Sequence, residues 1–285
     1  MRKQEPLQTR HSRVGIPGLQ AGEDVKQRPV GELLRQWREQ RRLSQLALSI
    51  QADISTRHLS FMETGRSSPS RDMVLRLAEE LDVPLRDRNQ MLLAAGYAPV
   101  YGETSLDAPE MVAVRSAVRR ILTGHEPYPA CVVDRRWNLV DSNAATQLFT
   151  AGVAPELMRP PVNTLRLSLH PKGMAARIRN LGEWRAHLLA RLRREIAVTA
   201  DEVLRELYKE AMTYPCDEPE VHQDNDVVVP LRIEYKGTEL AFLSTISTFG
   251  TAADVTVAEL AIESFFPADD ETAEALTAFR DQRRR

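Results

Sequence analysis

Apolar residues recur every three to four positions through the first third of the chain, which is the spacing of an amphipathic helix. In the first such segment, residues 31–42, the apolar side is formed by Leu33, Leu34 and Trp37, and arginines occupy much of the rest. Four further segments follow up to residue 95, and the last two begin after Ser70 and at Pro84. The pattern therefore predicts a bundle of five short helices.

Residues 43–66 predict two short helices at an angle to each other. Ser44 and Ser55 are suitable N-caps, because a serine hydroxyl accepts a hydrogen bond from the backbone N–H groups that open a helix. Gly65 fits the position after a helix end, where left-handed backbone is wanted. A helix–turn–helix needs one packed face and one face that reaches base edges in the major groove. The apolar residues at helical spacing are Leu46, Ala47 and Ile50 in the first helix, and Leu59 and Met62 in the second.

This segment resembles the helix–turn–helix of Xre and lambda-repressor-type proteins. Gln45 matches the Gln that opens the first helix, and Leu59, Glu63 and Gly65 match Leu-x-x-x-Glu-x-Gly at the end of the second. Asp53 stands at a turn position where that family often has glycine, and Asp tolerates left-handed backbone better than most residues. The resemblance implies an all-α, five-helix DNA-binding domain over residues 29–97.

The outward side of the second helix has side chains suited to DNA. Arg57 is the best base reader, since its guanidinium matches guanine O6 and N7. Gln45 can donate to a phosphate beside the N–H groups of its helix end. Phe61 either contacts thymine methyl groups or packs on the first helix, and Glu63 is expected to hold the fold together. The DNA-binding candidates are Gln45, Thr56, Arg57, His58, Ser60, Phe61 and Arg66. One such unit makes few contacts, so a dimer that places two units on double-stranded DNA is expected.

The pattern changes after a Pro- and Gly-containing linker at residues 98–110. An amphipathic helix is predicted at 111–122, and short strands at 130–133 and 137–141. A hairpin at 226–235 and 239–249 is indicated by β-branched residues around a Lys-Gly turn. Long helices at 181–198 and 201–212 and a last helix at 257–265 complete an α+β domain with an antiparallel sheet and inserted helices. Residues 1–28 are predicted to be a disordered arm, and 271–285 a charged C-terminal tail.

This second half resembles the PAS-like ligand-binding domain of MmyB-type regulators. The resemblance rests on the segments 129–145, 163–171, 180–195 and 242–269. Together with the front domain, it implies a homodimeric transcription regulator whose PAS-like domain, residues 111–270, can hold an apolar, fatty-acid-like molecule. We expect the regulator to require no cofactor.

An apolar pocket needs bulky walls and one or two polar anchors. The ligand-binding candidates are Trp137, Asn143, Phe149, Leu165, Trp184, Arg185, Leu188 and Phe242. Arg185 is the first choice as partner of an acidic head group, and the alternative is a surface arginine paired with Glu183. Further wall candidates are Leu139, Leu167, Leu231 and Phe249, and further polar candidates are Asn163, His170, Arg177 and His187. Each wall residue can equally be plain core.

Composition narrows the class of protein. The 285 residues contain 42% hydrophobic residues, enough for two cores. No apolar run approaches a membrane span of ~20 residues, and the start lacks the apolar stretch of a signal peptide, so we expect a cytoplasmic protein without a membrane partner. Residues 1–105 contain 16 Lys and Arg against 13 Asp and Glu, whereas the remainder contains 22 against 27. A weakly basic front suits phosphate contact. Cys131 and Cys216 are expected to be reduced thiols.

Three other functions remain open at this stage. An enzyme is not expected, because no Walker loop, Gly-x-Ser-x-Gly or His-Glu-x-x-His is present. The PAS-like domain could instead bind haem or a metal through His170, His187 and His222, although these histidines are not clustered in the sequence. It could also serve only for dimerisation.

Overall fold

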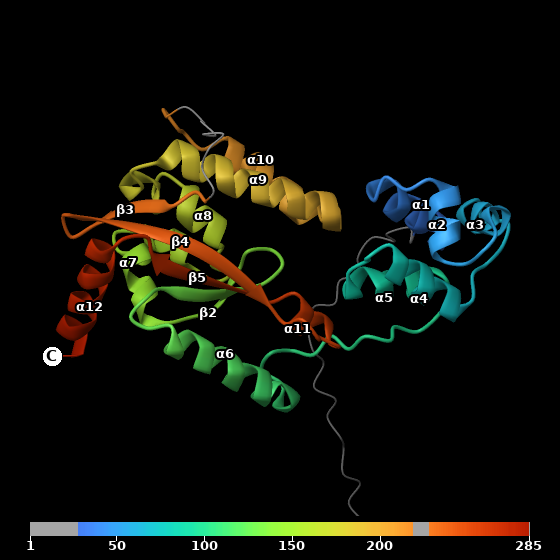
Figure 1. The fold of residues 1–285 in the computed structure, drawn as a ribbon, viewed down its shortest axis with the longest axis horizontal. Coiled ribbons are helices and arrows are strands. Elements are labelled where there is room, and N and C mark those ends of the chain that lie inside the picture. The colour runs from blue at the N-terminus through green and yellow to red at the C-terminus, as the bar shows by residue number, and fades with distance from the viewer. Residues whose placement is uncertain (1–27, 219–227, 285) are drawn as a thin grey trace, which may run out of the picture.

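The computed structural model describes residues 28–218 and 228–284. Within these ranges the chain forms a helical bundle and a larger α+β domain, joined by an extended segment (Figure 1). The arm predicted for residues 1–28 lies outside the described residues, except for Arg28, and so does His222. None of the described helices is long and apolar enough to cross a membrane.

The bundle has the five helices that the apolar pattern predicts. They are α1 (Val30–Gln40), α2 (Gln45–Gln51), α3 (Thr56–Glu63), α4 (Arg71–Glu80) and α5 (Leu85–Ala94). The hydroxyls of Ser44, Ser55 and Ser70 each accept a hydrogen bond from the backbone N–H three residues on, and so start α2, α3 and α4. Asp53 and Gly65 adopt left-handed backbone, with φ of 50° and 72°, as expected after α2 and α3. Local signals therefore account for most of the bundle's helix ends.

The inward face of α2 differs from the stripe expected from spacing. Leu46 and Ile50 are 60% and 71% exposed, whereas Leu48 and Ala52 are 0% and 2% exposed. Both pairs have i, i+4 spacing, so the sequence offers two apolar stripes on one short helix. The core selects the stripe that meets the buried side chains of α1 and α3, which include Leu34, Leu59 and Met62.

The segment that joins the two domains is not a free linker, because it is hydrogen-bonded to the second domain. Backbone groups tie residue 102 to the second domain, with Val255 N–H donating to the carbonyl of Gly102 over 2.7 Å. The Asp254 carboxylate also accepts from the N–H of Thr104 at 3.0 Å. Helix α6 (Val112–Gly124) follows.

Five strands form one antiparallel sheet, in agreement with the predicted α+β class. They are β1 (Ala130–Val133), β2 (Leu139–Ser142), β3 (Leu231–Tyr235), β4 (Thr238–Thr248) and β5 (Ala261–Pro267), in the order β2-β1-β5-β4-β3. Cys131 of β1 pairs with Glu263 of β5, and Ile246 of β4 pairs with the same residue from the other side. The last element before the C-terminal helix is thus the middle strand of the sheet.

The helix predicted at 257–265 is wrong. The structure has one helical turn, α11 (Val255–Ala258), followed by β5. A middle strand is covered on both faces, so apolar residues occur on both sides of it, and over so short a segment periodicity does not distinguish the strand from a helix. Here Ile262 packs with Val118 and Leu122 of α6, while Phe265 belongs to the main core on the opposite face.

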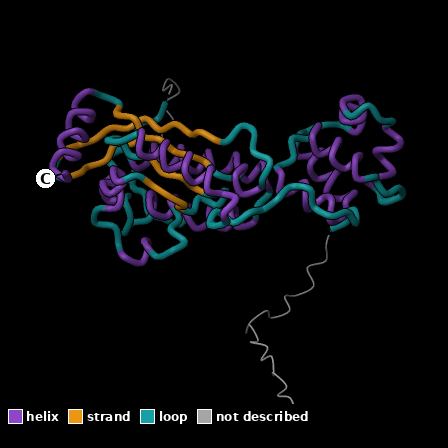
Figure 2. Tube along the Cα trace, turned by 90° about the horizontal axis from the view of Figure 1, so that it is seen from below, coloured by secondary structure: helices purple, strands orange, loops and turns teal. Residues whose placement is uncertain are grey.

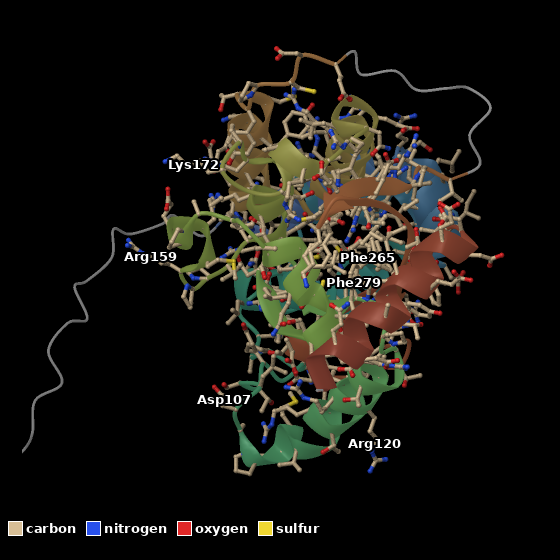
Figure 3. The ribbon with its side chains drawn as sticks, turned by 90° about the vertical axis from the view of Figure 1, so that its left-hand side faces the viewer. Asp107, Arg120, Arg159, Lys172, Phe265 and Phe279 are labelled. Atoms are coloured by element: carbon tan, nitrogen blue, oxygen red, sulfur yellow. The ribbon has the colours of Figure 1, made fainter. Side chains whose placement is uncertain are left out.

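Helices cover both faces of this sheet (Figures 1 and 2). Helix α6 lies on one face, and its Arg120 points away from the domain (Figure 3). The other face is covered by α7 (Gln147–Thr150), α8 (Thr164–Leu169), α9 (Leu181–Thr199) and α10 (Glu202–Met212). The main core lies between these helices and the sheet.

The residues expected as a charged tail form helix α12 (Asp270–Arg284) instead. Leu276 is 2% exposed, and the ring of Phe279 meets Tyr235 of β3 edge-on at 5.1 Å. Thr272 accepts a hydrogen bond from the N–H of Ala241 in β4, over 3.0 Å. The apolar residues among the charges are few, but they fall on one side of a helix, and this side packs on the sheet.

Candidate DNA interface and ligand cavity

The exposed side of α3 presents an aromatic ring between two arginines. The guanidinium carbons of Arg57 and Arg66 lie 5.2 and 5.9 Å from the ring centre of Phe61. Such contacts hold an arginine by attraction to the ring face. Arg57, His58 and Arg66 are exposed and Phe61 is half-buried, so the ring supports the two arginines at the surface of the domain.

Two of the DNA-binding candidates are held by other side chains. The amide of Gln45 donates to Glu63 over 2.8 Å, and the hydroxyls of Thr56 and Ser49 are 2.8 Å apart. Ser60 is half-buried, and its carbonyl accepts from the hydroxyl of Thr64 over 2.7 Å. Arg57, His58 and Arg66 remain as exposed DNA-binding candidates of α3 and its C-terminal turn.

Glu63 holds α1, α2 and α3 together, as expected. Its carboxylate accepts hydrogen bonds from Arg38 Nε at 2.6 Å and Nη2 at 2.9 Å, in addition to the bond from Gln45. The hydrogen bond to Glu63 raises the pKa of Arg38, and their opposite charges add to this effect. The helices also approach closely, because a Cβ on Gly31 would lie 2.4 Å from the carbonyl oxygen of Met62. The position of the reading helix thus depends on a buried ion pair.

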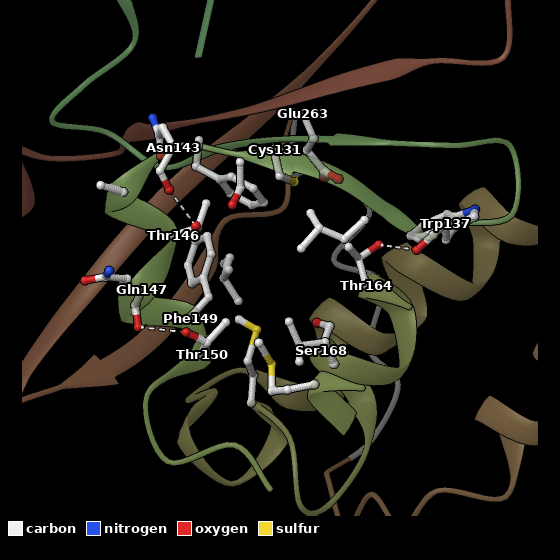
Figure 4. Close-up of a pocket in the computed structure, with 18 of the residues that line it drawn as sticks. Cys131, Trp137, Asn143, Thr146, Gln147, Phe149, Thr150, Thr164, Ser168 and Glu263 are labelled. Atoms are coloured by element: carbon white, nitrogen blue, oxygen red, sulfur yellow. Dashed lines mark hydrogen bonds between the residues drawn. The ribbon is translucent and has the colours of Figure 1, made fainter. Parts of the chain in front are cut away.

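A cavity of about 510 Å³ lies in the second domain between the sheet and helices α7, α8 and α9 (Figure 4). This volume is within the roughly 300–1,000 Å³ that small-molecule sites have. Among the predicted residues, those that line it are Trp137, Leu139, Asn143, Phe149, Leu167, Trp184, Leu188 and Leu231. Leu165 and Phe242 do not line the cavity and are fully buried core. Phe249 instead packs against the cluster under α6.

The polar anchors expected from the sequence mostly have other partners. Arg185 points away from the cavity, and its Nη2 donates to the carbonyls of Ala211 and Met212 at the end of α10. Trp184 and Leu188, spaced i, i+4, face the cavity, so the next position along the helix faces another neighbour. Arg177 donates to the carbonyls of Leu148 and Phe149.

The other polar candidates also have structural contacts. Asn163 caps α8. Asn143 borders the cavity, but its amide bonds the backbone of Leu122, Tyr128 and Ala130. The rings of His170 and His187 contact Tyr214 and Trp184. The described residues contain no group of three or more His, Cys, Asp or Glu side chains that could hold a metal ion.

Several lining residues were not among the sequence candidates, and Glu263 is the buried charged one among them. It lies on β5, is 6% exposed, and faces the cavity with Cys131 (Figure 4). Burial raises the pKa of Glu263, and the positive charge of Arg191 opposes this rise. A carboxylate within an apolar strand would have indicated this residue, but the segment was predicted to be a helix. Burial likewise raises the pKa of the Cys131 thiol, so it stays protonated.

An ion cluster joins the cavity domain to the DNA-binding domain. Arg86 of α5 makes two hydrogen bonds to Glu259, of 2.8 and 2.9 Å, and an ion pair with Glu103. Glu259 also pairs with Arg135 at 3.1 Å, and Arg135 pairs with Asp201. Arg135 belongs to the turn between β1 and β2, which also contains the cavity residue Trp137.

Asp87 lies beside this cluster on α5. Burial raises its pKa to about 6, with Arg135 acting in the opposite direction. Its Oδ2 atom is buried without a hydrogen-bond partner among the described residues. The contact between the domains therefore includes a carboxyl group that titrates in a mildly acidic range.

Comparison with known proteins gives two family matches and weak likenesses to solved structures. Residues 114–279 match the MmyB-like transcription regulator ligand binding domain, and residues 29–91 match a helix-turn-helix domain. No curated protein matches. A solved structure described as that of an RNA-binding Light-Oxygen-Voltage receptor is 15% identical with a TM-score of 0.23, over 90% of this chain and 64% of that one, and this similarity is too low to support an argument. The chain spans less than two thirds of that protein.

The order of the two matched domains agrees with the geometry of the molecule. A capped reading helix lies in the first domain and a mainly apolar cavity in the second, as expected for a helix-turn-helix domain followed by a regulator's ligand-binding domain. This chain belongs to the MmyB-like transcription regulators, with a helix–turn–helix DNA-binding domain followed by their ligand-binding domain.

Proposed function

We propose that this protein is a homodimeric, sequence-specific regulator whose affinity for its operator is changed by an apolar, fatty-acid-like ligand in the cavity. One observation supports this most directly. Trp137, which lines the cavity, and Arg135, which binds the interdomain cluster, belong to the same short turn. A ligand that displaces the first residue would therefore displace the second.

On the DNA side, we propose Arg57 as the main base-reading residue. Its position on the outward face of α3 and its support by Phe61 favour insertion into the major groove. Arg66 is suited to a phosphate on the same side. Each reading helix covers one half-site, so two subunits would bind half-sites about one helical turn apart, ~34–36 Å. Helix α6, whose apolar residues Val112 and Ile121 are exposed, is one candidate for the dimer surface.

On the ligand side, the cavity walls are mainly apolar and aromatic, which suits a flexible acyl chain. Arg119 lies at the open side, because its side chain is 61% exposed and still lines the cavity. It pairs with Asp141 at 2.8 Å. An acidic head group that stays at this opening could exchange with Asp141 for the guanidinium.

The route from ligand to DNA follows the ion cluster. Trp137 has left-handed backbone, with φ of 65°, so its ring is held by strained backbone and by its partners on α9. When the ligand moves this ring, Arg135 would shift relative to Glu259, which holds Arg86 on α5. A ligand changes the equilibrium only through different affinity for two arrangements, so this route requires the turn to adopt a second arrangement when the ligand is bound.

The test is a fluorescence-anisotropy titration of the full chain with an operator selected from random DNA, at fixed salt, with and without dodecanoate. We expect the operator dissociation constant to change when dodecanoate is bound. In an Arg135→Gln variant, dodecanoate binding should persist while its effect on DNA is reduced. An Arg205→Gln variant, which alters an exposed ion pair on α10, serves as the control. Equal operator affinity in the presence and absence of bound dodecanoate would refute the proposal.

A further inference from the structure

The cavity contains one carboxyl group where the sheet would be expected to supply an apolar side chain. Glu263 and Phe265 alternate along β5 and both line the cavity, and Cys131 is the neighbour of Glu263 on β1. Glu263 is only 6% exposed. Burial of a carboxylate is costly unless it is paired and hydrogen-bonded. A side chain of this kind at this position therefore needs a partner.

The partner within the chain is shared. Arg191 Nη1 lies 3.4 Å from Glu263, but Arg191 Nε also bonds Glu195 at 3.1 Å, and its guanidinium lies 4.1 Å from the centre of the Trp137 ring. Glu195 accepts a further hydrogen bond from the indole N–H of Trp137, over 2.5 Å. Two carboxylates thus share one guanidinium, and Glu263 has the longer contact. The cluster has an excess negative charge when all three groups are ionised.

The cavity has its positive charge at the opening and its negative charge in the interior. In the described part of the chain, the charged side chains that line it are Arg119 and Glu263. Arg119 is mostly exposed at the open side and paired with Asp141, whereas Glu263 lies in the interior. A simple carboxylate that entered the interior would meet a second carboxyl group. A hydrogen-bond donor would complete the coordination of Glu263.

We propose that Glu263 is the interior anchor of the ligand, and that the cavity selects apolar molecules whose buried end is an amine or a hydroxyl. This inference rests on the proposed function, because it assumes that the cavity is the ligand site. It narrows that function from an acyl chain of any kind to one with a donor at its inner end. A plain fatty acid then has to keep its carboxylate at the opening, near Arg119.

The test compares three probes with one chain length: dodecylamine, 1-dodecanol and dodecanoate. Their binding to the full chain is measured by calorimetry, so that no added label enters the cavity. We expect dodecylamine to bind the wild-type chain at least about tenfold more tightly than dodecanoate, since hydrogen bonds to charged groups are the stronger ones. The order of the three affinities tests the proposal without any variant.

Two variants locate the effect. Glu263→Gln keeps the size of the side chain and removes its charge, so it should weaken dodecylamine by about tenfold or more and leave dodecanoate unchanged. Arg119→Gln should weaken only dodecanoate. If dodecanoate binds the wild-type chain most tightly, or if Glu263→Gln leaves dodecylamine binding unchanged in a folded protein, the anchor is refuted. If none of the probes binds, the ligand cavity itself is refuted, and the anchor with it.

Discussion

Removal of the Glu63 side chain should lower the unfolding free energy of the DNA-binding domain more than removal of a surface ion pair does. The carboxylate is 2% exposed and accepts hydrogen bonds from Arg38 Nε, Arg38 Nη2 and the Gln45 amide. In Glu63→Ala, the side chain of Arg38, which is 10% exposed, would lose its two short bonds to Glu63 and keep only a 3.7 Å contact with Glu39. The loss of one partner of a buried pair costs about 3–5 kcal/mol, because the other charge is left without compensation.

That cost is large against the ~5–15 kcal/mol by which a domain is stable. The matched control is Glu39→Ala, because Glu39 forms an exposed ion pair with Arg35 on the same helix α1, its side chain is 54% exposed, and its contact with Arg38 is longer, at 3.7 Å. Water already solvates this pair, so its removal should change the unfolding free energy little. A double variant, Arg38→Met with Glu63→Leu, removes both charges and should recover part of the loss.

Hydrogen exchange by mass spectrometry measures the effect in the full chain, since peptides from α1 to α3 report on this domain alone. A loss of about 3–5 kcal/mol corresponds to amide exchange faster by about two to four orders of magnitude in these peptides. Peptides from the second domain provide an internal reference. If Glu63→Ala and Glu39→Ala accelerate exchange equally, the buried ion pair does not hold the reading helix, and the reasoning is refuted.

Three further predictions concern the DNA interface, the second domain and the contact between domains. Arg57→Ala should weaken binding to the selected operator by about 1–3 kcal/mol in anisotropy titrations. An equal loss of binding free energy on a site changed at one base would contradict base reading by this residue. Asn143→Ala should lower the urea-unfolding free energy of the second domain by at least about 2 kcal/mol, since it leaves backbone groups of Leu122, Tyr128 and Ala130 without their partner; a cost near zero would show that water replaces the amide. For Asp87, the folded chain keeps the proton up to a pKa of about 6, while the unfolded chain loses it near 3.8, so the unfolding free energy should fall as pH rises through this interval. Asp87→Asn should remove this decrease, and identical pH profiles of the two proteins would contradict it.

The sequence by itself determined the elements whose signals are local. Serine caps, the left-handed positions of Asp53 and Gly65, and apolar spacing are all read within one or two helical turns, and they predicted the five helices of the bundle. The conclusion that Glu63 is structural also followed from the sequence, because a carboxylate is unsuited to a surface that meets phosphates. The same local signals indicated the hairpin of β3 and β4.

Tertiary structure decided every feature that depends on which neighbour a side chain meets. By their spacing, Leu46 and Leu48 are equally suited to the core, and packing against α1 and α3 decides which of them is buried. The run before Pro267 became a strand because β1 and β4 pair with it on both sides, and this pairing placed Glu263 in the cavity. Arg185 turned to the end of α10, one position away from Trp184 on the cavity wall. Hydrogen-bond pairing between distant strands and the direction of each side chain are properties of the packed chain, and local periodicity does not contain them.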